Sequence, residues 1–189
     1  MSNICVFCGS SSGGHDAYRD AAAAVGSAIA AAGHRLIYGG GHVGLMGVVA
    51  DAVMHGGGAV TGVMTEQLVA SEVAHDGLTT LEVTADMHSR KARMAELSDG
   101  VVVLPGGFGT IDETFEMLTW NQLGLVAAPV VFLDVRDYYR SLFEFIEHSL
   151  AAGFLTDAHL GLVQRATDPA DAVRIAGGPP PVFSRKWID

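Results

Sequence analysis

Basic residues are scarce in this chain of 189 residues. Lys and Arg together number 11 against 21 Asp and Glu, which gives a formal net charge of −10. A nucleic-acid-binding surface needs clustered Lys and Arg to neutralise phosphates, and no run of basic residues is present. The charge balance therefore predicts that nucleic acid is not a partner.

Long apolar segments are also missing. The longest apolar run, Leu123–Leu133, has 11 residues and includes Pro129, whereas a membrane-spanning helix needs about 20. The N-terminus has no basic segment followed by an apolar stretch, so no signal peptide is visible. We therefore expect a cytoplasmic protein that does not insert into a membrane.

Cysteine is limited to Cys5 and Cys8, too few for a disulfide framework. Their CxxC spacing lacks the second ligand pair that a structural zinc site requires. A redox CxxC should lie at a helix N-terminus, but Cys5 falls within a β-rich run. The pattern favours packing inside a buried strand, and we expect no metal site.

Glycine, in contrast, is abundant: its 24 residues are nearly twice the share found in average proteins, roughly 7%. Neither a Gly-X-Y period nor a Pro-rich tract accompanies it, which excludes a collagen-like chain or a linker. We expect the glycines in turns and loops where the backbone closely approaches another group.

Short β-rich runs alternate with longer helical patterns along the whole chain. Strands are expected at 3–8, 35–38, 59–64, near 81–83, 100–104, 129–133 and near 162–163. Helices are expected at 16–32, 44–55, 87–97 with Asp86 as the cap, 110–123, 138–152 and 169–176. This alternation predicts an α/β fold with a doubly wound parallel sheet and helices on both faces. We expect a single domain, 1–176, and a C-terminal tail, 177–189, that begins with a Gly/Pro cluster.

Ligands of such sheets bind outside the carboxyl ends of the strands, where two Gly-rich loops are expected. The first loop contains Gly39-x-Gly41-x-x-Gly44, and Glu66 follows 22 residues after Gly44. This pattern satisfies the dinucleotide fingerprint and keeps an oxidoreductase as an alternative. However, the loop does not follow the first strand, where that fingerprint normally lies. Turn packing or another phosphate ligand is therefore the preferred interpretation.

The second loop, Pro105–Thr110, has the composition of a phosphate-binding loop. Its three glycines expose backbone N–H groups at a predicted helix start, and Thr110 adds a hydroxyl donor. No Gly-Lys-Ser/Thr follows, so it is not a P-loop. Asp112 and Glu113 come next and have two interpretations. They could complement the helix dipole as first-turn acids, or they could serve a part of the ligand other than its phosphate.

The segment Met87–Arg93 concentrates three cations, Arg90, Lys91 and Arg93, within four residues. A solvated helix face would explain such a cluster, and His88 alone is typical of a surface or capping histidine. A ligand-binding cluster is the alternative interpretation.

Five segments together resemble one known family. Residues 105–113 (PGGFGTIDE) fit its motif PGGxGTxxE and residues 87–91 (MHSRK) fit its motif MHxRK. Residues 6–11, 40–47 and 119–124 also match in order, so the resemblance covers roughly residues 3–165. By these residues the chain resembles the LOG ("Lonely Guy") family of cytokinin riboside 5′-monophosphate phosphoribohydrolases.

The resemblance implies a Rossmann-like fold, a cytosolic homodimer and no metal or redox cofactor. It implies hydrolysis of N6-modified AMP, and of AMP itself as a further candidate, to free base and ribose 5-phosphate. Arg90 and Glu113 would be the catalytic pair, with Gly107, Gly109 and Thr110 holding the phosphate. The implied substrate contacts are Glu72, Arg90, Lys91, Gly106, Gly107, Phe108, Gly109, Thr110, Ile111, Asp112, Glu113 and Thr119. Apolar side chains at 115, 118 and 120 could serve either a dimer or the core.

Breaking an N-glycosidic bond develops positive charge on the ribose, which a carboxylate near C1′ would stabilise. Relatives are also labelled lysine decarboxylases, but a pyridoxal-phosphate enzyme needs a Schiff-base lysine. The chain has only Lys91, inside the substrate motif, and Lys186 near its end. A non-catalytic nucleotide carrier stays as an alternative, although it would have no use for an Arg90–Glu113 pair.

Overall fold

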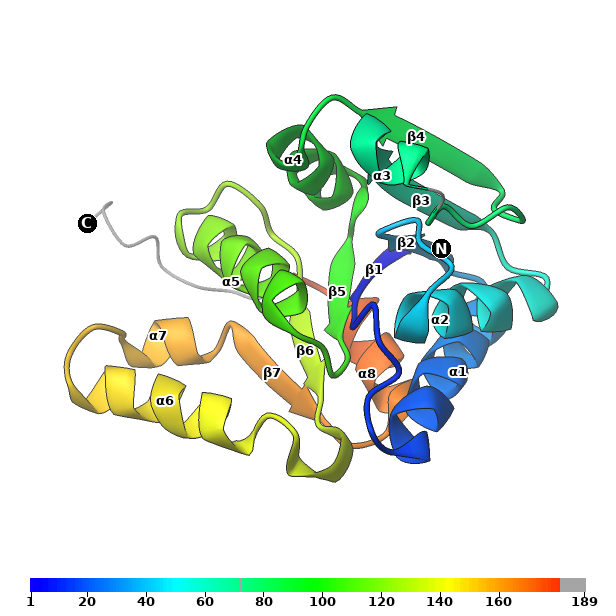
Figure 1. Ribbon diagram of the computed structural model, residues 1–189. Helices are drawn as coiled ribbons and strands as arrows, with labels where there is room; N and C mark the ends of the chain where they lie inside the picture. The colour runs from blue at the N-terminus through cyan, green and yellow to red at the C-terminus, as the bar shows by residue number, and fades with distance from the viewer. Residues whose placement is uncertain (72, 181–189) are drawn as a thin grey trace.

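A seven-stranded sheet lies at the centre of the computed structural model, which describes residues 1–71 and 73–180 (Figure 1). The strands are β1 (Asn3–Phe7), β2 (Arg35–Tyr38), β3 (Val60–Thr65), β4 (Thr80–Thr84), β5 (Gly100–Val103), β6 (Val130–Leu133) and β7 (Val163–Ala166). Their order is β4-β3-β2-β1-β5-β6-β7, and all neighbouring pairs are parallel. The predicted parallel α/β fold is confirmed.

Helices connect the strands. They are α1 (Asp16–Ala31), α2 (Gly44–His55), α3 (Glu66–Ala70), α4 (Met87–Leu97), α5 (Phe108–Gln122), α6 (Arg140–Ala151), α7 (Asp157–Leu160) and α8 (Pro169–Ala176). A 3₁₀ turn, η1 (Val135–Asp137), precedes α6. The sequence did not predict α3, α7 or η1, because a helix of three to five residues completes about one turn and leaves no 3.6-residue periodicity to detect.

Two hydrophobic cores lie on the two faces of the sheet. In β1, Ile4 and Val6 pack with α1, α2 and α8, whereas Cys5 and Phe7 pack with α4, α5 and α6. This alternation follows from the two-residue period of a strand. Figure 1 shows these two helical layers on opposite sides of the sheet, so the predicted coverage of both faces is confirmed.

Two helix starts position the candidate site. Helix α4 begins directly after Asp86, whose carboxylate accepts a hydrogen bond from the Ser89 N–H at 2.7 Å, which confirms the predicted cap. Helix α5 begins at Phe108, two residues before the predicted start, with Gly107 as its N-cap. As a result, no acidic residue lies in the first turn of α5.

The chain reverses its direction of travel across the sheet between α4 and β5. Strands β1 to β4 extend toward one edge, and the chain then returns to place β5 beside β1. The carboxyl ends of β1 and β5 therefore form the topological switch point, where such sheets bind ligands. Helix α8 ends at Ala176. The tail at 177–189 stays a prediction, because 181–189 lie outside the described residues. No described helix is long and apolar enough to cross a membrane.

Candidate active site

A cavity of about 210 Å³ opens at this switch point. Cys8, Gly9 and Ser10 reach it from the loop after β1, and Gly39 reaches it from the loop after β2. The loop after β5 contributes Gly107–Thr110, which we call the cradle. Arg90 and Glu113 complete the polar lining. The structure thus brings together the predicted catalytic pair and most of the predicted phosphate-binding loop.

The cradle combines a helix start that lacks a capping side chain with open space over its glycines. Gly107 caps α5 without a side-chain hydrogen bond, so the first N–H groups of the helix are not satisfied by a capping side chain. A Cβ at Gly107 or Gly109 would meet no described atom within 4 Å, so these glycines leave room over the backbone. Thr110 is buried and lines the same cavity. This combination suits an anion at a helix N-terminus.

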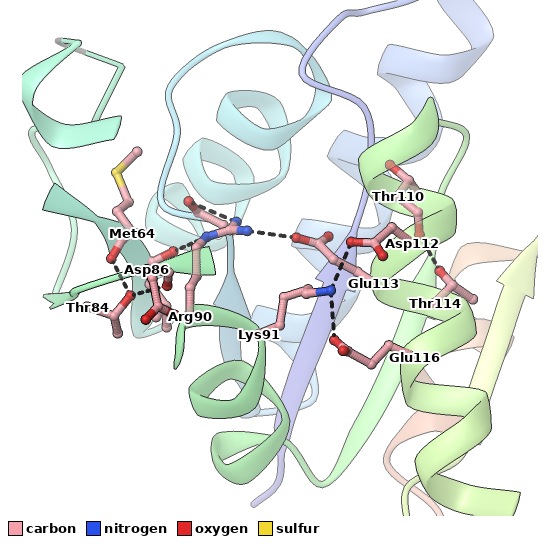
Figure 2. A network of polar contacts seen from close by, with 12 residues as sticks. Met64, Thr84, Asp86, Arg90, Lys91, Thr110, Asp112, Glu113, Thr114 and Glu116 are labelled. Carbon is pink, nitrogen blue, oxygen red and sulfur yellow. Dashed lines mark hydrogen bonds and ion pairs between the residues drawn. The ribbon is translucent and has the colours of Figure 1, made fainter. Parts of the chain in front are cut away.

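Arg90 is a buried cation held by three groups. Its Nε donates to the Val63 carbonyl at 2.8 Å and its Nη1 donates to Glu113 Oε1 at 2.9 Å. Its Nη2 lies 3.5 Å from the Gly39 carbonyl. Figure 2 shows the guanidinium reaching from α4 toward Glu113 on α5. The planar, branched guanidinium satisfies partners from three separate chain segments at once.

Glu113 is a partly buried carboxylate that faces the cavity, with 14% of its side chain exposed. Burial raises its pKa above the usual value, and Arg90 opposes this shift without cancelling it. Since α5 starts earlier than predicted, Glu113 lies beyond the first turn, where the helix dipole has little effect. The first-turn interpretation of Asp112 and Glu113 is therefore wrong.

Lys91 lies apart from the cavity. Its Nζ forms ion pairs with Asp112 at 3.0 Å and Glu116 at 3.1 Å, and Figure 2 shows it between these two side chains of α5. Burial alone would lower the pKa of Lys91, but the two carboxylates outweigh this effect and raise it. A Schiff-base lysine must lose its proton, so Lys91 does not fit pyridoxal phosphate. Lys186 lies outside the described residues.

Gly106, Ile111 and Thr119, three other predicted substrate contacts, do not line the cavity. Gly106 lines a neighbouring hollow, and Ile111 packs against the core beneath α5. Thr119 is exposed, donates to the Phe115 carbonyl at 2.7 Å and lines a separate hollow of about 170 Å³. Glu72 lies outside the described residues. Substrate contact by these residues, and by Lys91 and Asp112, stays a prediction.

The first Gly-rich loop is filled by the protein itself. Cβ atoms on Gly39 and Gly44 would collide with the Arg90 guanidinium and with the backbone of Ser10. Met46 crowds Gly39 and Gly41 in the same way. These contacts account for the glycines by packing, one of the two interpretations that the sequence preferred to a dinucleotide. Glu66 begins α3 as a first-turn acid.

Several residues of the cavity were not predicted. Gly9, Ser10 and Met46 line it, and they fall in the segments 6–11 and 40–47, which resemble the family but had no contact assigned to them. Cys8 also lines it. Burial raises the pKa of Cys5 to about 12 and also raises that of Cys8, which favours the protonated thiols. Within 1–71 and 73–180, no group of three or more His, Cys, Asp or Glu could hold a metal ion.

Comparisons with known proteins place the chain in a family. Residues 46–176 match the family described as "possible lysine decarboxylase". A Rhodococcoides fascians protein named cytokinin riboside 5′-monophosphate phosphoribohydrolase is 50% identical over 82% of this chain and 79% of its own length. A rice protein (Oryza sativa subsp. japonica) named as a probable enzyme of this kind is 45% identical over 90% of this chain and 75% of its own.

The molybdenum cofactor binding protein of Rippkaea orientalis has a similar structure, with a TM-score of 0.70 and 22% identity. The match covers 92% of this chain and 94% of that one, and it shows likeness of fold alone. The family match and the two sequence relatives together confirm the resemblance carried by the motifs. This chain belongs to the LOG family, whose family model bears the description "possible lysine decarboxylase".

Proposed function

We propose that this protein hydrolyses the N-glycosidic bond of N6-modified adenosine 5′-monophosphates and releases free base and ribose 5-phosphate. One observation carries the proposal: the partly buried carboxylate of Glu113, which is paired with Arg90, shares a cavity with the cradle. The names of relatives at 50% and 45% identity support the same reaction.

The chemistry follows from the positions of these groups. As the bond from C1′ to the base breaks, the base leaves with the electron pair and takes up a proton, while water adds to C1′. Positive charge develops on the ribose in the transition state, and the Glu113 carboxylate would stabilise it. The carboxylate could also orient or activate the attacking water. Arg90 holds the carboxylate through a charge-assisted hydrogen bond of 2.9 Å.

Phosphate anchoring would set the distance between the sugar and Glu113. The cradle N–H groups and Thr110 suit the 5′-phosphate, and Glu113 follows Thr110 by about one helical turn on α5. Phe108, 98% exposed, lines the mouth of the same cavity. Binding energy from the phosphate would thereby hold C1′ beside the carboxylate, an effect that commonly appears in turnover as well as in affinity.

Product analysis tests this proposal against the two alternatives. The protein is incubated with N6-isopentenyl-AMP, with AMP and with N6-isopentenyladenosine, and products are separated by chromatography. We expect free base and ribose 5-phosphate from a nucleotide, and far slower release from the nucleoside. Binding of a nucleotide without release of base would support the carrier. Reduction of added NAD⁺ or NADP⁺ would support the oxidoreductase.

We also infer a homodimer, as the resemblance implies. Leu125, Phe145 and Phe154 are exposed apolar side chains on the segments around α5 and α6. Phe115 lines the hollow beside Thr119, whereas Leu118 and Trp120 also pack against the core. A second copy that covered part of this apolar surface would remove it from water. A cytoplasmic location stays a prediction from the sequence.

A further inference from the structure

Three consecutive carbonyl oxygens just before the cradle each accept a hydrogen bond from outside their loop. The Leu104 carbonyl accepts from the Tyr139 hydroxyl at 2.6 Å, that of Pro105 from the Gly9 N–H at 3.1 Å, and that of Gly106 from the Tyr138 hydroxyl at 2.6 Å. The loop is thus held from two sides, by the segment after β1 and by the segment after β6.

The bond to Gly106 has a geometric consequence for the cradle. The Gly106 carbonyl and the Gly107 N–H belong to one peptide unit, and in a trans peptide these two groups point in opposite directions. Tyr138 lines the neighbouring hollow, which shares Gly107 with the cavity but contains neither Arg90 nor Glu113. By holding the carbonyl toward its own ring, the Tyr138 hydroxyl turns the Gly107 N–H away from Tyr138. The other hollow that Gly107 lines is the cavity with Arg90 and Glu113.

The backbone before Tyr138 is in a conformation that side chains rarely adopt. Arg136 and Asp137, both in η1, have φ angles of 59° and 57°. Such strain persists only where surrounding contacts enforce it. The Tyr138 ring lies edge-on to the rings of Tyr139 and Tyr18, with distances between ring centroids of 4.9 Å and 5.8 Å. These contacts hold the turn in place.

We propose that Tyr138 is a positioning residue for the phosphate cradle: its hydroxyl fixes the peptide between Gly106 and Gly107 so that the Gly107 N–H is preorganised for a phosphate ester. The inference rests on the proposed function only in taking the cradle as a phosphate site. Tyr138 need not touch the substrate, because it acts through the Gly106 carbonyl.

Tyr138→Phe tests the role, since it keeps the ring contacts and removes only the hydroxyl. Calorimetric titration with ribose 5-phosphate measures the affinity of the cradle for a phosphate ester without any turnover. We expect the Kd to rise about 2- to 10-fold, the usual effect of one lost hydrogen bond. KM for the nucleotide should rise by a similar factor with a smaller change in kcat. The inhibition constant of N6-isopentenyladenosine, which lacks the phosphate, should not change.

Tyr18→Phe is the matched control. It removes a hydroxyl from the same neighbouring hollow and leaves both tyrosine-to-loop hydrogen bonds in place. Ribose 5-phosphate should bind this variant as it binds the wild type. Melting curves of both variants check that each is folded before titration.

The outcomes separate this inference from the proposed function. Wild-type Kd and KM values in folded Tyr138→Phe would overturn the positioning role, as would an equal loss of affinity for the nucleoside. Failure of the wild type to bind ribose 5-phosphate would overturn it as well. If the wild type binds ribose 5-phosphate but releases no base, the proposed hydrolysis fails, while the Kd comparison still decides the role of Tyr138.

Discussion

Glu113 is the residue on which the proposed chemistry depends, and Glu113→Gln removes its charge while keeping its size. If the carboxylate stabilises the transition state, turnover should fall on the order of 10²-fold or more. Nucleotide affinity should persist or improve, because a negative charge near the phosphate is lost. Steady-state release of base and direct titration of the nucleotide measure the two effects.

The same helix offers a control for this variant. Glu116 also lies on α5, is also paired with a cation and does not line the catalytic cavity. Glu116→Gln should therefore keep a turnover close to that of the wild type. Near-normal release of base by a folded Glu113→Gln protein would remove Glu113 from the mechanism.

The titration of Glu113 gives a second prediction. Burial raises its pKa, so the carboxylate should bind a proton at a pH above 4.5, the ordinary value for Glu. The charged form is the one that the mechanism needs, so activity should fall as the pH decreases through this raised pKa. NMR of ¹³C-labelled glutamate side chains measures the pKa directly, and Glu113→Gln assigns the resonance. A Glu113 titration midpoint at or below 4.5 would contradict the prediction.

At the scale of elements, the start of α4 positions Arg90 one turn into the helix. Asp86→Ala removes the cap on the Ser89 N–H and should lower the melting temperature by about 2–4 °C. The hydrogen bond from Ser89 lowers the pKa of Asp86 in the folded protein. The cap therefore stabilises the fold above the ordinary Asp pKa, and this contribution disappears as the pH falls through the lowered value.

Melting curves at several pH values test the cap. The difference in melting temperature between wild type and Asp86→Ala should be largest at neutral pH and should become smaller in strong acid. Asp86→Asn is the conservative control, because Asn caps helices as well as Asp does and carries no charge. A melting temperature of Asp86→Ala equal to that of the wild type at neutral pH would show that α4 does not need this cap.

The long elements could be predicted from the sequence because their signals are local. Alternating apolar runs and helical periodicity located the strands and the main helices, and Asp86 marked the start of α4. Gly109 made the start of α5 ambiguous, since glycine can lie inside or before a helix. Residues 66–70 and 157–160 are too short for periodicity to reveal a helix.

The candidate site could be predicted only in part. The motifs indicated Arg90, Glu113 and the cradle, which do line one cavity. The placement of Lys91 between Asp112 and Glu116 depends on how α4 packs against α5, and no local pattern specifies it. Tyr138 reaches Gly106 across 32 positions in the chain, a contact that the sequence alone does not indicate.

At the scale of the whole molecule, the proposed homodimer can be tested by measuring the mass in solution. Static light scattering at micromolar concentration should give about twice the chain mass of 19.7 kDa. Phe145→Asp would place a charge on an exposed apolar position of α6 and should shift the mass toward the monomer if this face forms the interface. Phe154→Asp places the same charge at a second exposed apolar position, just beyond α6, so the masses of the two variants can be compared. A wild-type mass of one chain would contradict the dimer.

The reversal of the chain between α4 and β5 means that neither half of the sequence contains a working site. Residues up to Leu97 supply Arg90, and residues from Gly100 onward supply Glu113 and the cradle. A break in the short connection between them would divide the proposed catalytic pair between two polypeptides. Release of base by co-expressed halves would then report their reassociation, so the fold contains a natural division point for a split-enzyme reporter.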